Sequence, residues 1–261
     1  MWLLDRKKEL PDLTHKTVIS PLHYGETIEI ALSRGIEGET YINGKRFVFE
    51  RENVFFIPPR QPHTSFYKKG GSGDGDMIAA FHINVEALAL YIDVKKLLLA
   101  DGRGLSGFPN RFSGFDFVLS AIERIMDESH SLAARLSELL SLLAFFSENA
   151  GDDGGAEYNR ASVRIADWIE AHYKERLSVA NAAAHFGFSK FYFCKWFKAH
   201  TGVTFSECLN AVRISHASID LAHGFSVEET AARCGFTDPS YFIKVFKRYR
   251  GTTPKTYTAT E

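Results

Sequence analysis

The sequence has few cysteines and no long apolar run, and these two absences exclude several classes of protein. Its 3 cysteines, Cys194, Cys208 and Cys234, have neither Cys-x-x-Cys spacing nor a partner histidine cluster, so we expect reduced thiols rather than disulfides or zinc ligands. No stretch approaches the roughly 18 apolar residues of a membrane span, and the opening MWLLDRKKEL lacks the apolar core of a signal peptide. We therefore expect a cytoplasmic protein without membrane attachment.

The common motifs of catalysis are also missing. The sequence contains no nucleophile–base pair, no P-loop and no dinucleotide-binding fingerprint, so we do not expect an enzyme. With 261 residues the chain is long enough for two domains, each burying its own core.

The formal net charge of −1 conceals an asymmetry along the chain. Residues 160–261 contain 14 Lys+Arg and 9 Asp+Glu, a charge of +5, while the preceding residues contain 17 and 23, a charge of −6. A positive field confined to the C-terminal part is expected if that part faces phosphates. Modest asymmetry is common between domains, so the charge supports a nucleic-acid partner without establishing one.

One segment of the C-terminal part occurs twice. Ser178–Lys198 (SVANAAAHFGFSKFYFCKWFK) matches Ser226–Lys247 (SVEETAARCGFTDPSYFIKVFK), with one residue inserted in the second copy. Each copy predicts a short helix, a turn at Gly-Phe, and a second helix opened by a hydroxyl residue, Ser189 or Thr237. These are the parts of a helix-turn-helix, and two in tandem indicate a protein that reads DNA.

The second copy carries a long ordered motif, AARCGFTDPSYFIKVFK at residues 231–247, followed by GTTPKTY at residues 251–257. With it, residues 160–257 resemble the DNA-binding domain of the AraC/XylS family of bacterial transcription regulators. The resemblance implies an all-α domain over residues 160–261, with two helix-turn-helix units joined by a helix at Ser206–Ala222. It also implies double-stranded operator DNA and RNA polymerase as partners.

The helical period separates the two faces of each DNA-reading helix. The residues predicted to point inward are Phe193, Trp196 and Phe197 in the first copy, and Phe242, Val245 and Phe246 in the second. The family's base-reading positions and their outward neighbours fall on Phe191, Cys194, Lys195, Pro239, Ser240, Ile243 and Lys244. Lysines there can reach guanine, and apolar side chains can contact thymine methyls. For phosphate contacts the candidates are Lys190, Lys198, Lys247 and Arg248.

The N-terminal half alternates between apolar and polar residues in the manner of strands. The expected segments are Glu26–Leu32, a hairpin at Thr40–Phe49 turning at Asn43-Gly44, Asn53–Ile57, Pro62–Tyr67 after a Pro58-Pro59 pair, and Met77–Ile83 after a flexible Gly70–Gly75 loop. Many short strands predict a small antiparallel β-barrel over residues 1–112. With the helical C-terminal domain, the predicted fold class is α+β.

A spaced pattern within these strands, His23…Glu29…Gly35…Ile42-Asn43-Gly44…Phe56-Ile57-Pro58-Pro59…Pro62-His63, resembles the cupin-like sensor domain of many AraC-type regulators. We predict a pocket for a small-molecule effector at His23, Glu29, His63 and His82. Aromatic residues supply an apolar lining, with Phe47, Phe49, Phe55, Phe56, Phe66, Tyr67 and Phe81 as the candidates. The plainer alternative is that His63 and His82 are hydrogen-bonded core residues.

A metal site is the competing reading of the same residues. Enzymatic cupins hold a metal with several histidines and a glutamate, but Gly25 replaces the second histidine of the usual His-x-His pair. An incomplete ligand set weakens a transition-metal site, although a water can fill a position, so no metal or other cofactor is predicted. Two alternatives stay open: a metal-dependent cupin enzyme fused to a DNA-binding domain, and a regulator controlled by a partner protein.

Two helices are predicted between the barrel and the C-terminal domain, at Phe115–Glu128 and Leu132–Asn149, in a segment spanning residues 113–150. The second has an apolar stripe formed by Leu132, Leu136, Leu139, Leu140, Leu143 and Phe146. The resembled family commonly dimerises through such helices, which makes Leu132, Leu136, Leu139, Leu143 and Phe146 a candidate homodimer seam. Packing against the chain's own barrel is the alternative. A polar linker containing GDDGG follows at residues 151–159.

Overall fold

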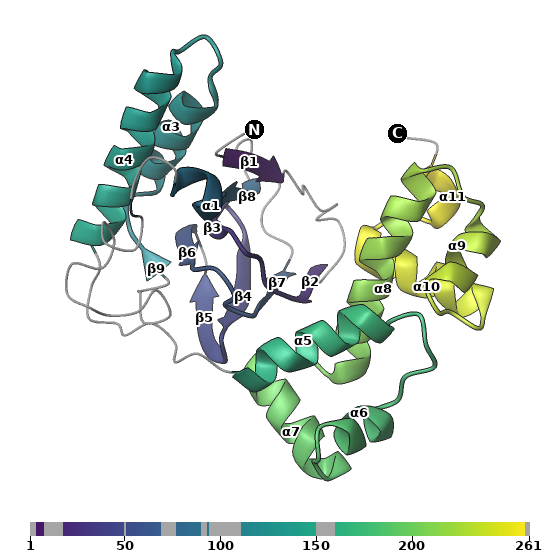
Figure 1. The fold of residues 1–261 in the computed structure, drawn as a ribbon. Coiled ribbons are helices and arrows are strands. Elements are labelled where there is room, and N and C mark those ends of the chain that lie inside the picture. The colour runs from purple at the N-terminus through teal and green to yellow at the C-terminus, as the bar shows by residue number, and fades with distance from the viewer. Residues whose placement is uncertain are drawn as a thin grey trace.

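The computed structural model describes residues 4–7, 18–49, 51–68, 77–89, 93, 111–149 and 160–258. Within these ranges an N-terminal β domain with attached helices is followed by a helical domain (Figure 1), so the predicted α+β class is confirmed. The glycine-rich loop predicted at residues 70–75 and the linker predicted at residues 151–159 lie outside the described residues.

The described strands of the β domain form two antiparallel sheets, with strand orders β1-β8-β3-β6-β9 and β2-β7-β4-β5. The strands are β1 Leu4–Lys7, β2 Val18–His23, β3 Ile28–Arg34, β4 Glu37–Ile42, β5 Lys45–Phe49, β6 Glu52–Ile57, β7 His63–Lys68, β8 Met77–Ile83 and β9 Arg111–Phe112. A short helix, α1 Val85–Leu88, follows β8. The predicted barrel is thus two facing sheets. The predicted hairpin turn has positive φ at both Asn43 (50°) and Gly44 (89°), as a type I′ turn requires.

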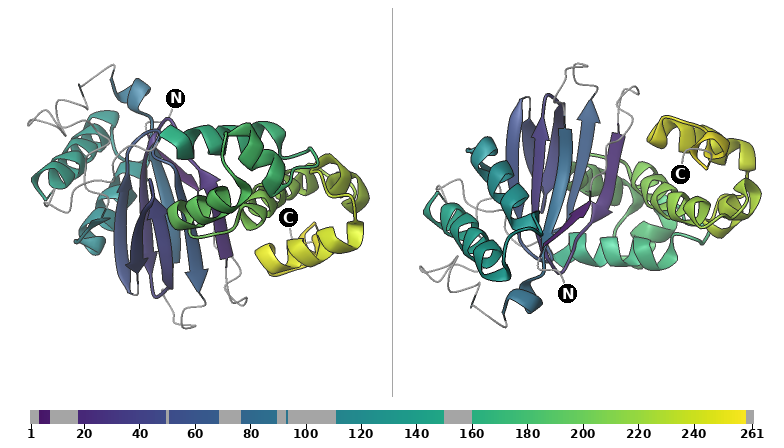
Figure 2. Two further views of the ribbon diagram at one scale, coloured as in Figure 1. Left: turned by 90° about the horizontal axis from the view of Figure 1, so that it is seen from below. Right: turned by 90° about the horizontal axis from the view of Figure 1, so that it is seen from above.

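Strand alternation gives each face of the first sheet a different partner. Ile28, Ile30 and Leu32 of β3 are buried in a cluster with residues of α3 (Phe115–Met126) and α4 (Leu132–Glu148). These helices cover the side of the β domain opposite the helical domain (Figure 2). Because successive strand residues point to opposite faces, Glu29 between Ile28 and Ile30 points toward the second sheet.

The predicted dimer seam requires a correction. Leu139, Leu143 and Phe146 are no more than 1% exposed and pack with α3 and the first sheet inside one chain. They are therefore core residues and cannot also form a seam between two chains. Leu136 is partly buried against the same cluster, and only Leu132 (55% exposed) and Leu140 (36% exposed) of the stripe face outward. Periodicity located the stripe, but it does not determine what covers it.

The helical domain contains both helix-turn-helix units. Its helices are α5 Arg160–His172, α6 Val179–His185, α7 Lys190–Thr201, α8 Phe205–Ala222, α9 Val227–Arg233, α10 Pro239–Arg250 and α11 Pro254–Tyr257. Helix α8 connects the first unit to the second (Figure 1). Helix α10 packs along α8, where the Tyr249 hydroxyl donates to the carbonyl oxygen of Glu207 and Arg250 donates to the Ser218 hydroxyl. Arg213 of α8 fixes the loop after α5, because its guanidinium donates to the carbonyl oxygens of Tyr173 and Glu175, each at 2.7 Å. No helix in the described part of the chain combines the length and apolar character needed to cross a membrane.

Candidate functional site

Each DNA-reading helix of the two units begins at a side-chain cap. The Ser189 hydroxyl accepts a hydrogen bond from the backbone N–H of Tyr192 at 3.2 Å. In the second copy the cap is Asp238, whose carboxylate accepts from the backbone N–H of Ser240 at 2.8 Å. The prediction of Thr237 as the opening residue is wrong, because the inserted residue lengthens the turn and a carboxylate satisfies the free N–H groups better.

This correction sets the correspondence between α7 and α10. With Ser189 equivalent to Asp238, Phe191 corresponds to Ser240, Cys194 to Ile243, and Lys195 to Lys244. The predicted inward residues Phe193, Phe197, Phe242, Val245 and Phe246 are buried, and Trp196 is partly buried. The predicted outward residues are all exposed, namely Phe191, Cys194, Lys195, Pro239, Ser240, Ile243 and Lys244. The ring of Phe191 is 81% exposed, so it contributes little to the domain's packing.

The positive charges on these helices are mostly unpaired. Among the described residues, no ion pair involves any of Lys190, Lys195, Lys198, Lys244 and Lys247, and all five are exposed. Arg248 differs, because its guanidinium lies 3.5 Å from the carboxylate of Glu207. The lysines therefore present an uncompensated positive surface, which is the electrostatic requirement for binding a polyanion.

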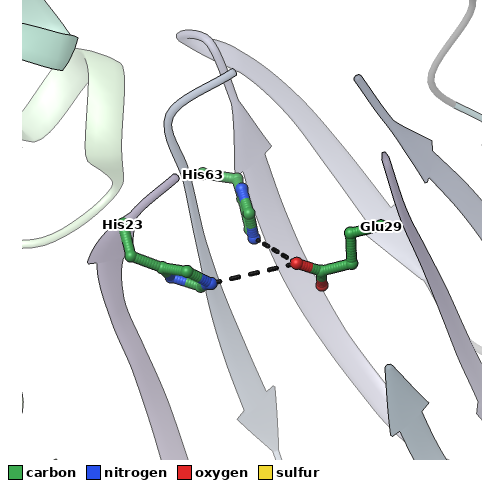
Figure 3. A group of neighbouring side chains, drawn as sticks. All are labelled: His23, Glu29 and His63. Atoms are coloured by element: carbon green, nitrogen blue, oxygen red, sulfur yellow. Dashed lines mark ion pairs between the residues drawn. The ribbon is translucent and has the colours of Figure 1, made fainter. Parts of the chain in front are cut away.

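A second group of polar side chains lies between the two sheets of the β domain. Glu29 from β3 meets His23 from β2 and His63 from β7 (Figure 3). The carboxylate Oε2 of Glu29 is 3.2 Å from Nε2 of His63 and 4.0 Å from Nε2 of His23. The two imidazole rings are 4.1 Å apart between centroids. His82 of β8 is paired with Glu29 in the sheet, and its Nδ1 lies 3.1 Å from the Thr27 hydroxyl.

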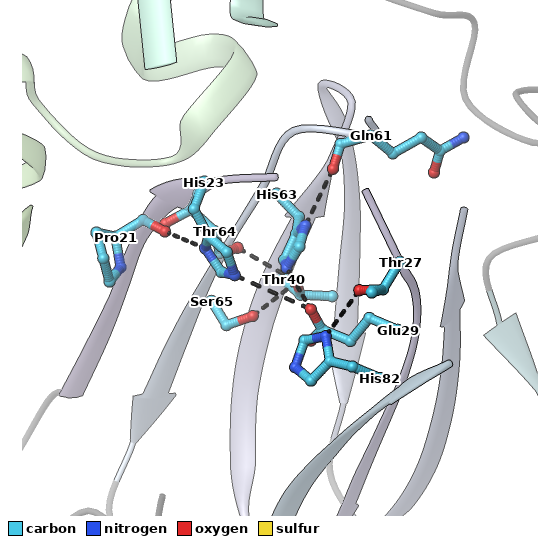
Figure 4. A network of polar contacts seen from close by, with 10 residues as sticks. All are labelled: Pro21, His23, Thr27, Glu29, Thr40, Gln61, His63, Thr64, Ser65 and His82. Carbon is cyan, nitrogen blue, oxygen red and sulfur yellow. Dashed lines mark hydrogen bonds and ion pairs between the residues drawn. The ribbon is translucent and has the colours of Figure 1, made fainter. Parts of the chain in front are cut away.

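Backbone carbonyl groups on the side away from Glu29 fix the orientations of the two imidazoles. Nδ1 of His23 is 2.7 Å from the carbonyl oxygen of Pro21, and Nδ1 of His63 is 3.0 Å from that of Gln61 (Figure 4). A carbonyl oxygen can only accept, so both Nδ1 atoms carry the proton and donate it. Both Nε2 atoms are thereby turned toward Glu29.

The electrostatics of the cluster favour a negative carboxylate beside a positive partner. Burial raises the pKa of Glu29, but the neighbouring His63, His23 and His82 outweigh it and lower that pKa to about 2. Burial lowers the pKa of His63, and the Glu29 carboxylate overcomes this and raises it above its ordinary value.

The aromatic residues proposed as a lining divide between different surroundings. Phe47, Phe55 and Tyr67 lie between the sheets. Phe56 and Phe81 pack instead against α3 and α4, and Phe66 packs against the helical domain. The sequence set therefore overestimates the apolar surface available to a ligand, because alternation sends every second aromatic residue to the outer face.

Strand β2 connects this cluster with the helical domain. It lies against α5, α8 and α10, and Leu22 is buried in the core of the helical domain. The hydroxyl of Tyr24, just after the strand, donates to the carboxylate of Asp167 on α5. Gly202, at the end of α7, packs so closely on Tyr41 and Phe66 of the second sheet that any side chain there would clash with both rings. Sequence reasoning missed this interface, although apolar residues on both faces of β2 were a signal that both faces are covered.

Comparison with known proteins places the C-terminal part in a known group. A helix-turn-helix domain family matches residues 182–260. An uncharacterized HTH-type transcriptional regulator of Staphylococcus aureus strain MSSA476 is 34% identical over 95 residues, covering 36% of this chain and 13% of that protein. YpdC, an uncharacterized HTH-type transcriptional regulator of Escherichia coli K12, is 34% identical over 96 residues, covering 36% of this chain and 34% of that protein. The chain thus spans only a minor part of the length of these relatives.

Solved structures of ToxT are similar over both domains. An apo ToxT variant from Vibrio cholerae strain SCE256 has a TM-score of 0.55 and 14% identity, covering 98% of this chain and 96% of that chain. At this identity the likeness concerns the fold, and the fold it shares is an N-terminal β domain followed by two helix-turn-helix units.

Proposed function

Residues 182–260 form a helix-turn-helix domain of the AraC type, and from this premise we propose that the chain is a sequence-specific DNA-binding transcription regulator. One observation carries the proposal: α7 and α10 are equivalent helices, one in each unit, and each presents an exposed face whose lysines form no ion pair among the described residues. A helix of this kind fits the major groove of B-DNA. Two of them about 34 Å apart would enter successive grooves on one side of the duplex.

Within this proposal the exposed residues divide by role. Lys195 and Lys244 occupy equivalent positions on the second turns of the helices and are assigned to guanine, while Phe191 and Ile243 are assigned to thymine methyls. Cys194, Pro239 and Ser240 lie on the same faces. Contacts to phosphate are assigned to Lys190, Lys198, Lys247 and Arg248. Of these four, Arg248 would first have to leave Glu207.

The β domain is the regulatory part in this proposal. His23, Glu29 and His63, with His82 on the adjacent strand, form the site for a small effector, and strand β2 carries the signal to the helical domain. The supporting observation is that β2 contributes His23 to the cluster and Leu22 to the core of the helical domain. Occupancy of the site would then alter how the DNA-reading helices are held and presented to the promoter, where RNA polymerase is the expected partner.

The test is binding of the full chain to duplex DNA at several salt concentrations. The affinity should fall steeply between roughly 50 and 200 mM salt, because phosphate contacts release counterions. Lys195→Ala and Lys244→Ala should each relax the preference at particular base pairs in a selection from random duplexes. Each substitution should reduce the binding free energy to the preferred sequence by about 1–3 kcal/mol. Lys247→Ala should instead weaken binding to all sequences and reduce the salt slope by about one.

The matched control is Lys45→Ala, which removes one positive charge from the β domain and should change neither property. A chain without salt-sensitive binding at low ionic strength would refute the proposal. If Lys195→Ala, Lys244→Ala and Lys247→Ala behave alike, the division into base and phosphate contacts is wrong.

A further inference from the structure

The cluster between the sheets has the composition and geometry of a ligand set for a cation. The Nε2 atoms of His23 and His63 and a carboxylate oxygen of Glu29 all lie within 4.8 Å of one another. No other group of three His, Cys, Asp or Glu side chains converges in this way among the described residues. The three side chains come from three strands of two sheets, so the fold itself brings them together.

The hydrogen bonds on the far side of the imidazoles direct both Nε2 atoms toward Glu29. Each Nδ1–H is committed to a backbone carbonyl, so Nε2 is the nitrogen that faces the carboxylate of Glu29 and is the atom available to a metal ion once it carries no proton. Nε2 of His63 is fully buried and forms no hydrogen bond, although the carboxylate of Glu29 is 3.2 Å away. A buried carboxylate beside imidazole nitrogens needs a positive charge next to it, which a protonated His63 or a bound cation supplies.

The distances suit a metal ion in particular. Donor atoms about 2.1 Å from a common ion are about 3.0–3.5 Å apart, and the His63–Glu29 separation of 3.2 Å falls in that range. The His23–Glu29 separation of 4.0 Å needs to shorten by less than about 1 Å. His23 can make this movement because β2 is an edge strand with an irregular register between Ser20 and His23.

We propose that a divalent transition-metal ion binds between His23, Glu29 and His63 and is the effector sensed by the β domain. This rests on the proposed function and names the ligand class of its regulatory site. Two imidazoles and one carboxylate suit Zn²⁺, Ni²⁺ or Fe²⁺, whereas Mg²⁺ and Ca²⁺ prefer oxygen ligands alone. A carbonyl that holds the far nitrogen of each imidazole is also the usual orienting contact of metal-bound histidine.

The absence of a fourth protein ligand fits an exchangeable ion. Gly25 stands where a further histidine would complete the set, and the side chain of His23 is 43% exposed while that of His63 is 4% exposed. The remaining coordination positions therefore face solvent on the His23 side. Three protein ligands plus water is the arrangement of open metal sites, which a sensor needs so that the ion can enter and leave.

The experiment uses the full chain, stripped of metal with a chelator and carrying Cys194→Ser to remove the one exposed thiol. Zn²⁺ and Ni²⁺ are added separately, bound metal is measured by equilibrium dialysis with elemental analysis, and thermal unfolding is recorded. We expect about one equivalent bound and a higher unfolding temperature, because a ligand of the folded state stabilises it. Mg²⁺ should do neither.

The decisive variants are His23→Ala and Glu29→Gln, which should weaken binding by at least about ten-fold. His23 is chosen because it is half-exposed, so its removal spares the core if a change at buried His63 prevents folding. The control is His130→Ala, an exposed histidine paired with Asp127 outside the sheets, which should bind metal as the parent does.

Failure of the parent to bind either ion, or equal binding by His23→Ala, would overturn the metal site. The metal-stripped chain with Cys194 intact is tested separately for salt-sensitive binding to duplex DNA, because Cys194 lies on the proposed DNA-reading face. A chain that binds DNA but no metal would refute this inference alone, whereas a chain that binds metal but no DNA would refute the proposed function.

Discussion

Leu22 and His23 are consecutive residues of strand β2 and face different domains. Leu22 is buried in the core of the helical domain, while His23 points between the sheets toward Glu29. The alternation of a strand thus places a residue of the His23–Glu29–His63 cluster and an interdomain contact one peptide apart. A displacement of β2 at His23 cannot occur without changing how Leu22 packs, which gives the two domains a direct physical connection.

The interdomain hydrogen bond next to this pair is open to a direct test. The Tyr24 hydroxyl donates to Asp167, and this bond, with burial, raises the pKa of Tyr24 to about 12. We expect Tyr24→Phe to lower the free energy of unfolding by about 0.5–1.5 kcal/mol, as measured by urea unfolding of the full chain. Tyr192→Phe, whose hydroxyl has no partner among the described residues, should have no effect; an equal loss in both would rule out the interdomain bond as the cause.

The turns of the two units differ in how tightly they are packed. Gly187 and Gly235 occupy equivalent positions, both with positive φ (72° and 79°). A Cβ on Gly235 would lie 2.8 Å from the carbonyl oxygen of Tyr173 and 2.7 Å from that of Lys174, whereas a Cβ on Gly187 meets nothing within 4 Å. Gly187→Ala should cost about 1–2 kcal/mol from backbone strain alone.

Gly235→Ala should cost at least about 1 kcal/mol more than Gly187→Ala, because the backbone carbonyls must also move. The two free energies of unfolding, measured under the same conditions, give the difference directly. Equal losses of unfolding free energy in the two variants would mean that the loop after α5 moves away from the new Cβ at no energetic cost.

The burial of the apolar stripe of α4 within one chain also leads to a prediction. Leu143 is fully buried, so Leu143→Asp should destabilise the β domain by more than about 3 kcal/mol and abolish its cooperative unfolding transition. Leu140→Asp, one turn away on the exposed face of α4, should change stability by less than about 0.5 kcal/mol. Circular dichroism melting of both variants checks this. If the Leu143→Asp chain stayed folded and only its oligomeric state changed, the result would support a dimer interface at this stripe.

The pH dependence of stability should report the cap of α8. Burial raises the pKa of Glu207, but hydrogen bonds from the Thr204 backbone N–H and hydroxyl, aided by Arg248, outweigh burial and lower that pKa below its ordinary value of 4.5. A carboxyl with a depressed folded pKa stabilises the fold above its unfolded pKa, and this stabilisation is lost as the pH falls.

The wild type should therefore exceed Glu207→Gln in stability near pH 6, and the gap should narrow below about pH 4.5. Urea unfolding of both proteins near pH 6 and below about pH 4.5 measures this difference in the free energy of unfolding. Glu228→Gln, an exposed glutamate of α9 outside any capping box, provides the control with a gap that stays small throughout. A constant gap for Glu207→Gln would exclude the charge as the source of the stabilisation.

The sequence predicted what depends on local pattern. Met77–Ile83 was located to the residue, and the buried faces of α7 and α10 follow from the spacing of Phe193 and Phe197 and of Phe242 and Phe246. Such features need only strand or helix periodicity and a turn residue with the right backbone freedom.

The remainder depended on contacts between distant residues, which no local pattern contains. The stripe of Leu139 and Leu143 is equally suited to a partner chain or to the chain's own sheet. The convergence of His23 with Glu29 and His63 depends on the register of three strands, and the role of Leu22 depends on how two domains meet. The cap at Asp238 was missed because either Thr237 or Asp238 can open a helix.

The single extra residue of the second copy lies in the turn before α10 and leaves the helix itself unchanged. In the proposed function, each of the two DNA-reading helices is therefore a separate module with its own start point, and the same outward positions would contact DNA in both. If the outward residues of α7, from Phe191 to Lys195, replaced those at the matching positions of α10, both helices would prefer the same base pairs. The preferred DNA sequence would then be a direct repeat of one half-site. The duplication in the protein sequence would be matched by a repeat in the DNA sequence that it binds.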